Sequence, residues 1–193
     1  MADFHKTMVE VFDLEGILSN HSLDAGKETC FGISRVYNPS WEGWARVDEI
    51  KANYQDPIGG NPLPEIRDDA LLREMVLRFY KAAYWDPLRG DDNPSQRIAT
   101  ELMDIGINIK SGKRQAVTFL QRALNGLNLD GIRWPDIPED GVMGPATLHN
   151  IQVAVSKGRE DDVVKLVNCI QGVYYMENSQ EVFLAGLLRR VKL

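Results

Sequence analysis

The residue whose position best favours acid–base chemistry is Glu15, at the end of the apolar stripe of an N-terminal helical pattern. Gly16 and a polar, glycine-containing stretch follow it. A carboxyl group that projects from a hydrophobic wall into a cleft has a raised pKa, because burial disfavours its charged form. It can then donate a proton to a leaving oxygen, as glycosidic bond cleavage requires. Position alone also fits a solvated residue, since acidic residues near helix ends are usually exposed.

Other kinds of catalytic site find little support in the residue spacing. The three histidines show no ligand spacing among themselves or with the cysteines, so we expect no metal site. Residues 126–137 match only the middle of a calcium-binding loop, because Gly126 and Ile137 replace its two end carboxylates. No serine lies in a GxSxG motif, and Cys30 has no visible activating partner. We therefore expect no cofactor.

The composition is that of a globular chain long enough to bury a core. It has 193 residues, of which 44% are hydrophobic and 26% are charged. A net charge of −6 offers no basic surface for nucleic acid, which we exclude as a partner. The N-terminus lacks the basic start and apolar core of a signal peptide, and no apolar run is long enough to span a membrane. We expect a protein made in the cytoplasm, with Cys30 and Cys169 as reduced, mostly buried thiols.

Helical periodicity dominates the elements that must position Glu15. Apolar residues recur at spacings of three and four, and β-branched alternation is nearly absent. Four predicted helices cover 4–15, 41–47, 160–176 and 179–190. Four others are predicted from their starts, which lie after Asp68 or Asp69, at Pro94, after Ser111 and at Pro145. The stretch DPIGGNPLPEIRDD is interpreted as a connection. The predicted class is all-α, with at most a small β-hairpin within residues 19–34.

The polar stretch after Glu15 carries a resemblance to a known family. EG at 15–16 with DAGKETCFGIS at 24–34 is similar to the E-G-G … D-P-G-G-x-T-x-x-G-I-S signature of glycoside hydrolase family 108. These lysozyme-like N-acetylmuramidases include phage endolysins and proteins described as secretion activators. Three further blocks follow in the family's order: YKAAYWDPLRGD at 80–91, LMDIGINIKSGKRQAVTFLQRALN at 102–125 and DGVMGPATL at 140–148. The last block resembles a turn of the family's peptidoglycan-binding region.

The resemblance covers nearly the whole chain and implies both a fold and a function. It implies a lysozyme-like catalytic region over 1–93 and a helical peptidoglycan-binding-like region over 94–193, packed together as one globule. The implied reaction is hydrolysis of the β-1,4 bonds between N-acetylmuramic acid and N-acetylglucosamine in bacterial peptidoglycan, without a cofactor. The place of action would be the cell wall or periplasm, reached through a holin or another export helper. A non-catalytic wall-binding or interaction protein, or a plain helical adaptor, is the alternative.

The family's catalytic glutamate falls on Glu15, and its glycine-rich loop falls on residues 24–34. Within that loop, Thr29 or Asp24 would help to place a water molecule or to stabilise charge. Gly32 and Ser34 would belong to the floor and lip of a sugar cleft. Asp24 has a second interpretation, because an aspartate before small residues often orders a turn through its own side chain.

The later blocks supply four further substrate-binding candidates. Tyr84 and Trp85 resemble cleft aromatics on which sugar faces stack, although aromatics at helix ends are more often core residues. Asp104 and Asn108 lie four apart on a predicted helix. They either line the cleft as ligands for N-acetyl groups or bond to each other across the core.

Overall fold

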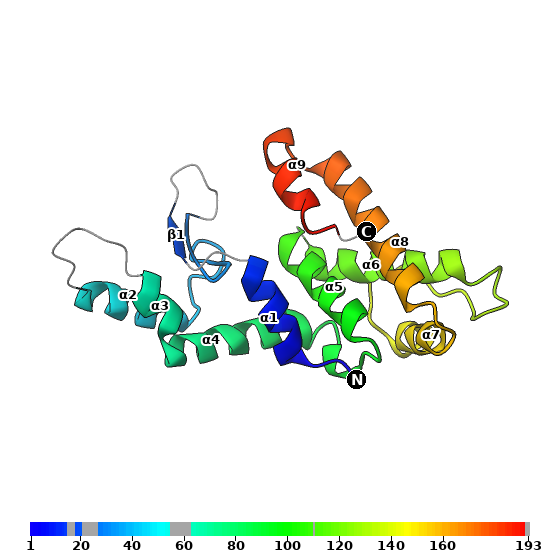
Figure 1. Cartoon of the computed structure of the whole chain (residues 1–193), viewed down its shortest axis with the longest axis horizontal. Helices are drawn as coiled ribbons and strands as arrows, with labels where there is room; N and C mark the ends of the chain where they lie inside the picture. Colours follow the sequence, from blue (N-terminus) through cyan, green and yellow to red (C-terminus); the bar gives the residue numbers. More distant parts are fainter. Residues whose placement is uncertain (15–17, 21–26, 55–62, 110, 192–193) are drawn as a thin grey trace. The chain divides into compact units, whose positions relative to one another are not determined.

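The computed structural model describes five stretches of the chain, namely residues 1–14, 18–20, 27–54, 63–109 and 111–191 (Figure 1). The chain divides into two compact units, one formed by Met8–Ala83 and the other by Met1–Thr7 with Tyr84–Leu193. The chain passes between the units within α1 (Phe4–Leu14) and again after Ala83. The division predicted between residues 93 and 94 stays a prediction.

The unit of residues 8–83 contains a small antiparallel sheet with the strand order β1-β2-β3. Its strands are β1 (Leu18–Asn20), β2 (Glu28–Cys30) and β3 (Ile33–Ser34). Thr29 is paired with Ser19 on one side and with Ser34 on the other. The predicted hairpin within 19–34 is therefore confirmed, and a third short strand extends it.

The helices of the same unit are α2 (Gly43–Asn53), α3 (Leu63–Asp68) and α4 (Ala70–Tyr80). The side chain of Asp69 accepts a hydrogen bond from the Leu72 backbone N–H at 2.7 Å, which confirms one of the two predicted caps of α4. The interpretation of DPIGGNPLPEIRDD as a connection was wrong at its end, because α3 forms there. Its second residue, Pro64, is compatible with a first helical turn, and Ile66 is fully buried.

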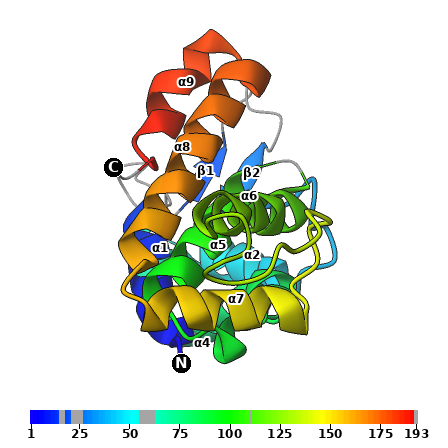
Figure 2. The same cartoon turned by 90° about the vertical axis from the view of Figure 1, so that its right-hand side faces the viewer.

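The unit that contains residues 84–193 is helical. A π-helical turn (Lys81–Trp85) leads into it, and a 3₁₀ turn (Gly90–Asp92) follows. Its longer helices are α5 (Gln96–Asn108), α6 (Gly112–Leu127), α7 (Pro145–Ser156), α8 (Glu160–Asn178) and α9 (Glu181–Leu188). Every residue from Ile98 to Gly106 is buried, so the middle of α5 belongs to the core. Helix α6 packs against α5 and α8, α7 crosses beneath α6, and α9 packs against α8 (Figure 2).

The helix starts in this unit correct two sequence predictions and confirm a third. Helix α5 begins after Ser95 rather than at Pro94, because the Ser95 hydroxyl accepts the Ile98 N–H at 3.0 Å. Ser111 precedes α6, but its backbone is left-handed, with φ of 59°, and its side chain makes no capping bond. Pro145 is the first residue of α7, as predicted.

The two cysteines differ in burial. Both thiols are free, but only Cys30 is buried; Cys169 is exposed, which corrects the expectation that both are mostly buried. Within the described stretches, no helix is long and apolar enough to cross a membrane. The same stretches hold no group of three or more histidine, cysteine or acidic side chains arranged for a metal ion.

Candidate active site

The G-I-S part of the loop motif contains the second residue of a tight hairpin turn, Gly32, and the strand β3 that follows it. Cys30 and Ile33 are paired, so Phe31 and Gly32 are the two turn residues, with φ of 47° and 78°. Two successive positive φ angles are typical of a type I′ turn, which matches the twist of the flanking strands. Glycine adopts this conformation without a steric penalty, which explains Gly32 in the motif.

Phe31 holds the same left-handed conformation without being a glycine, and its contacts offset the backbone strain. Its side chain is 6% exposed, and its ring centroid lies 5.7 Å from that of Phe12 on α1. Its carbonyl oxygen accepts a hydrogen bond from the Tyr80 hydroxyl at 2.8 Å. The turn is therefore fixed to α1 by packing and to the end of α4 by a buried hydrogen bond.

Thr29 and Ser34 are brought together by the strand register. Directly opposite residues of an antiparallel pair present their side chains on the same face, so the two hydroxyls are neighbours. Thr29 is half-buried, and its hydroxyl lies 3.5 Å from the Lys27 carbonyl oxygen, which is long for a hydrogen bond. Ser34 is buried, and its hydroxyl accepts the Tyr37 N–H at 3.4 Å. Of the two, Thr29 is better able to hold a water molecule or a ligand.

A network of charges fixes the same hairpin to α2. The guanidinium group of Arg35 is paired with Glu28 at 2.8 Å and with Asp48 by bonds of 3.0 and 2.5 Å. Lys51 on α2 also contacts Glu28, and Arg35 lies 4.4 Å from the ring centre of Trp44. Glu28 is the neighbour of Thr29, so this network holds the backbone beside the candidate hydroxyl. Sequence reasoning missed the pairs of Arg35 with Asp48 and of Lys51 with Glu28, because their members lie 13 and 23 residues apart.

Two of the predicted catalytic residues, Glu15 and Asp24, lie outside the described residues. The described chain on either side of Glu15 is the end of α1 at Leu14 and the start of β1 at Leu18. Leu18 is paired with Cys30, which follows Thr29. The catalytic roles of Glu15, Asp24 and Thr29 stay predictions.

The two predicted aromatic residues differ in exposure. Trp85 is 1% exposed, its indole N–H donates to Asp91 at 2.7 Å, and its ring centroid lies 5.6 Å from that of Phe4. No face of this ring is open to a sugar, so the structure supports the alternative that Trp85 is a core residue. Tyr84 is half-buried, and the Lys113 ammonium lies 5.6 Å from its ring centre.

Asp104 and Asn108 contact each other, as one of the two interpretations of their spacing predicts. The Asn108 amide donates to the Asp104 carbonyl oxygen at 2.8 Å and to its carboxylate at 3.2 Å. The same carboxylate accepts a 2.7 Å bond from Arg190, and the two charged side chains are only 11% and 14% exposed. Arg190 lies 86 residues away, and no sequence signal identified it.

The DGVMGP turn and the L-Q-x-A-L block of α6 are partners in one internal structure. The buried Gln121 amide donates to the Asp140 carboxylate at 2.9 Å and to the Val142 carbonyl at 3.1 Å, and the Gln121 oxygen accepts the Gly141 N–H at 2.9 Å. The Asp140 carboxylate also accepts the Val142 N–H at 2.9 Å, and this bond, followed by that from Gln121, holds the pKa of Asp140 below its usual value. Gly141 has a φ of 72°, and a Cβ there would lie 2.4 Å from Arg114. The motif therefore has a structural role in joining α6 to α7.

The match to a family model places the chain in a class of enzymes, the glycosidases. A family model described as "Glycosyl hydrolase 108" matches residues 8–109, and one described as "Predicted Peptidoglycan domain" matches residues 115–192. Because the first match covers more than half of the chain, the protein belongs to the glycosyl hydrolase 108 family. This confirms the resemblance of the sequence blocks.

The fold is similar to that of a solved structure from Brucella abortus, titled "Structure of Brucella abortus SagA". The TM-score is 0.55 at 20% sequence identity, over 97% of this chain and 92% of that chain. A likeness at this identity concerns the fold. No curated protein matches the chain.

Proposed function

We propose that the protein is a muramidase that hydrolyses the β-1,4 bonds between N-acetylmuramic acid and N-acetylglucosamine in peptidoglycan. One observation carries this proposal. A glycosidase domain over residues 8–109 and a peptidoglycan domain over residues 115–192 lie in the same chain. A glycosidase that is joined to a domain for peptidoglycan has the glycan strands of the cell wall as its nearest substrate. The proposed place of action is the cell wall, and a holin or another export helper would release the protein to it.

Glu15 is the proposed general acid, which protonates the oxygen of the leaving sugar. Its spacing from Met8 and Val11, at i+7 and i+4, continues the stripe that those residues bury on α1. Both are almost completely buried, with exposures of 1% and 2%. A general acid must be protonated before the reaction, and burial among apolar groups favours the protonated form of a carboxyl group.

Thr29 is the proposed residue that places water or stabilises charge, with Asp24 as the alternative. Support comes from the sheet, because β1 begins three residues after Glu15 and is paired with β2, which contains Thr29. Gly32 belongs to the same hairpin and is partly exposed, so its backbone groups can reach a sugar near Thr29. The Ser34 hydroxyl is buried and already accepts the Tyr37 N–H, which favours a role in holding the hairpin. Tyr84, which is partly exposed and belongs to the other unit, stays a separate candidate for stacking on a sugar ring.

The proposal is tested by digesting purified peptidoglycan and identifying the new reducing ends by mass spectrometry after borohydride reduction. A muramidase leaves reduced N-acetylmuramic acid, whereas a glucosaminidase leaves reduced N-acetylglucosamine. We expect Glu15→Gln to lower the rate by about 10² to 10⁴-fold, the usual contribution of a general acid. Glu10→Gln, on the exposed part of the same helix, is the matched control and should keep the wild-type rate.

Each other outcome has a definite meaning. New ends of N-acetylglucosamine would keep the glycosidase and refute the muramidase. An active, folded Glu15→Gln variant would refute the proposed acid. A wild-type protein that cosediments with peptidoglycan but releases no ends would support the non-catalytic wall-binding protein instead.

A further inference from the structure

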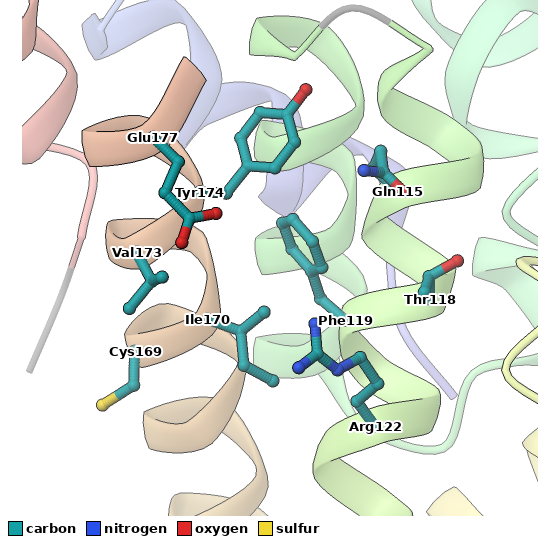
Figure 3. Close-up of a pocket in the computed structure, with 9 residues that line it drawn as sticks. All are labelled: Gln115, Thr118, Phe119, Arg122, Cys169, Ile170, Val173, Tyr174 and Glu177. Atoms are coloured by element: carbon teal, nitrogen blue, oxygen red, sulfur yellow. The ribbon is translucent and has the colours of Figure 1, made fainter. Parts of the chain in front are cut away.

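A groove lies between α6 and α8, in the unit that contains residues 84–193. Its volume is about 290 Å³, and Figure 3 shows its lining side chains. The floor is apolar and is formed by Phe119 of α6 with Ile170 and Tyr174 of α8. The rings of Phe119 and Tyr174 are in contact, with centroids 5.6 Å apart. Such a floor favours methyl and methylene groups over hydroxyl groups.

Opposite charges lie at the two ends of this floor. Arg122 lies at the same end as Cys169, and Glu177 lies toward the end that contains Gln115 (Figure 3). The side chain of Arg122 is 54% exposed, and its carboxylate neighbour Glu139 is 3.8 Å away, at the limit of an ion pair. Its guanidinium group can therefore still bind a carboxylate of a ligand.

The length of the groove fits a short peptide. Residues 115 and 122 are seven positions apart on α6, which corresponds to about 10 Å along a helix. An extended peptide of about three residues covers the same distance. All the residues that line the groove fall within 115–192, the region matched by the peptidoglycan domain. Gln121, which lies on the same helix within that region, is not available to a ligand, because its polar groups are already bonded within the protein.

We propose that this groove binds the peptide stem of peptidoglycan, an inference that rests on the proposed wall substrate. A stem carries free carboxylates, small methyl side chains and, in its diamino acid, a free ammonium group. The carboxylate binds Arg122, the ammonium group binds Glu177, and the methyl groups cover Phe119 and Ile170. A hydroxyl-rich glycan strand has no ammonium group for Glu177 and would bury hydroxyls against an apolar floor.

The two cysteines supply a measurement that does not depend on hydrolysis. Cys169 is exposed and lines the groove, whereas Cys30 is fully buried and burial raises the pKa of its thiol to about 12. N-ethylmaleimide should therefore alkylate the native protein at Cys169 alone, because the thiolate is the reactive form. Because Cys169 is one of the residues that line the groove, a bound ligand should slow its alkylation. The alkylation rate thus reports occupancy.

The probe is the free tetrapeptide L-alanyl-γ-D-glutamyl-meso-diaminopimelyl-D-alanine, which contains no glycosidic bond. We expect it to slow the alkylation of Cys169 saturably, by about tenfold when nine in ten grooves are filled. Arg122→Gln should raise the half-saturating concentration of the tetrapeptide by about ten- to a hundredfold, as expected for loss of a charged hydrogen bond. Arg114→Gln, an exposed arginine on the same helix outside the groove, should leave it unchanged. Glu177→Gln should weaken the binding of the tetrapeptide. It should leave unchanged the binding of an analogue that has L-alanine in place of the diamino acid.

Three results would overturn the peptide site. The first is a Cys169 alkylation rate that millimolar tetrapeptide leaves unchanged. The second is protection of Cys169 by glycan strands stripped of peptide that equals protection by the tetrapeptide. The third is a loss of protection in Arg114→Gln as large as that in Arg122→Gln. None of these results affects the reducing-end assay. Conversely, a protein without hydrolytic activity can still show protection, so failure of the peptide site and failure of the proposed hydrolysis are separate observations.

Discussion

Replacing Gln121 by leucine should destabilise the unit that contains residues 84–193, although leucine is similar in size and its apolar side chain suits a buried position. Gln121 is 1% exposed and bonds to three consecutive residues of the turn that precedes α7. Its amide donates to the carboxylate of Asp140 and the carbonyl of Val142, and its oxygen accepts the N–H of Gly141. Leucine can form none of these bonds.

The magnitude follows from the bonds to backbone groups. Each neutral hydrogen bond contributes about 1 kcal/mol net, and a backbone group left without a partner costs at least as much. The bonds to Gly141 and Val142 therefore predict a loss of about 2 kcal/mol in the free energy of unfolding. The contribution of the exposed Asp140 carboxylate is left out of this value, because solvent screens it.

Urea unfolding followed by far-UV circular dichroism measures this loss. With an m-value of about 2 kcal/mol/M, the midpoint should fall by about 1 M. Gln152→Leu, on the exposed side of α7, is the matched control and should stay within about 0.5 kcal/mol of the wild type. A Gln121→Leu midpoint indistinguishable from that of Gln152→Leu would refute the structural role assigned to the motif.

A second variant tests the electrostatic part of the same reasoning. Gln121→Glu places a carboxylate where the amide now lies, 2.9 Å from that of Asp140. Two adjacent carboxylates cannot both ionise without repulsion, so the pKa of the pair rises. At pH 7 this variant should be less stable than Gln121→Leu, and it should recover relative to Gln121→Leu as acidification protonates one of the two groups. Absence of this recovery would contradict the geometry.

The remaining predictions concern single contacts and use the same urea assay. Asp69→Ala should cost about 1 to 2 kcal/mol through loss of the α4 cap. Because Arg46 and the capped N–H hold the pKa of Asp69 below its usual value, this advantage is complete above the unfolded pKa of about 4 and is lost as the pH falls through the lower native pKa. Arg190→Met leaves the buried Asp104 without this cation and should cost about 3 kcal/mol, part of which Asp104→Asn restores in the double variant. Gly32→Ala, at a φ of 78°, should cost about 1 kcal/mol, and a neutral result would refute the left-handed turn.

Some elements were predictable because their signals are local. A cap at Asp69 needs only the three residues that follow it, and Pro145 at a helix start needs only its own fixed φ. The hairpin was placed correctly within residues 19–34. Helix α3 was missed, because proline and glycine nearby indicated a connection, while the burial of Ile66 that anchors the helix comes from tertiary packing.

The candidate site shows the same division. Sequence blocks identified the family and selected Thr29, Gly32 and Ser34, which the strand register brings into one hairpin. They left the roles of Trp85 and Asp104 open, since a stacking aromatic and a core aromatic have the same residue type. The structure separates these roles through burial of the Trp85 ring and through the pairing of Asp104 with Arg190.

The sequence by itself determined the helical class, the positions of the main helices and the family, because periodicity, caps and motif spacing depend on residues close together in the chain. Only the tertiary structure decided which polar groups are partners, such as Gln121 with the turn 19 residues later. It also decided that Cys169 is exposed and that an apolar groove with a charge at each end lies between α6 and α8. The physical reason is that burial and charge pairing depend on how distant segments pack, which no local pattern records.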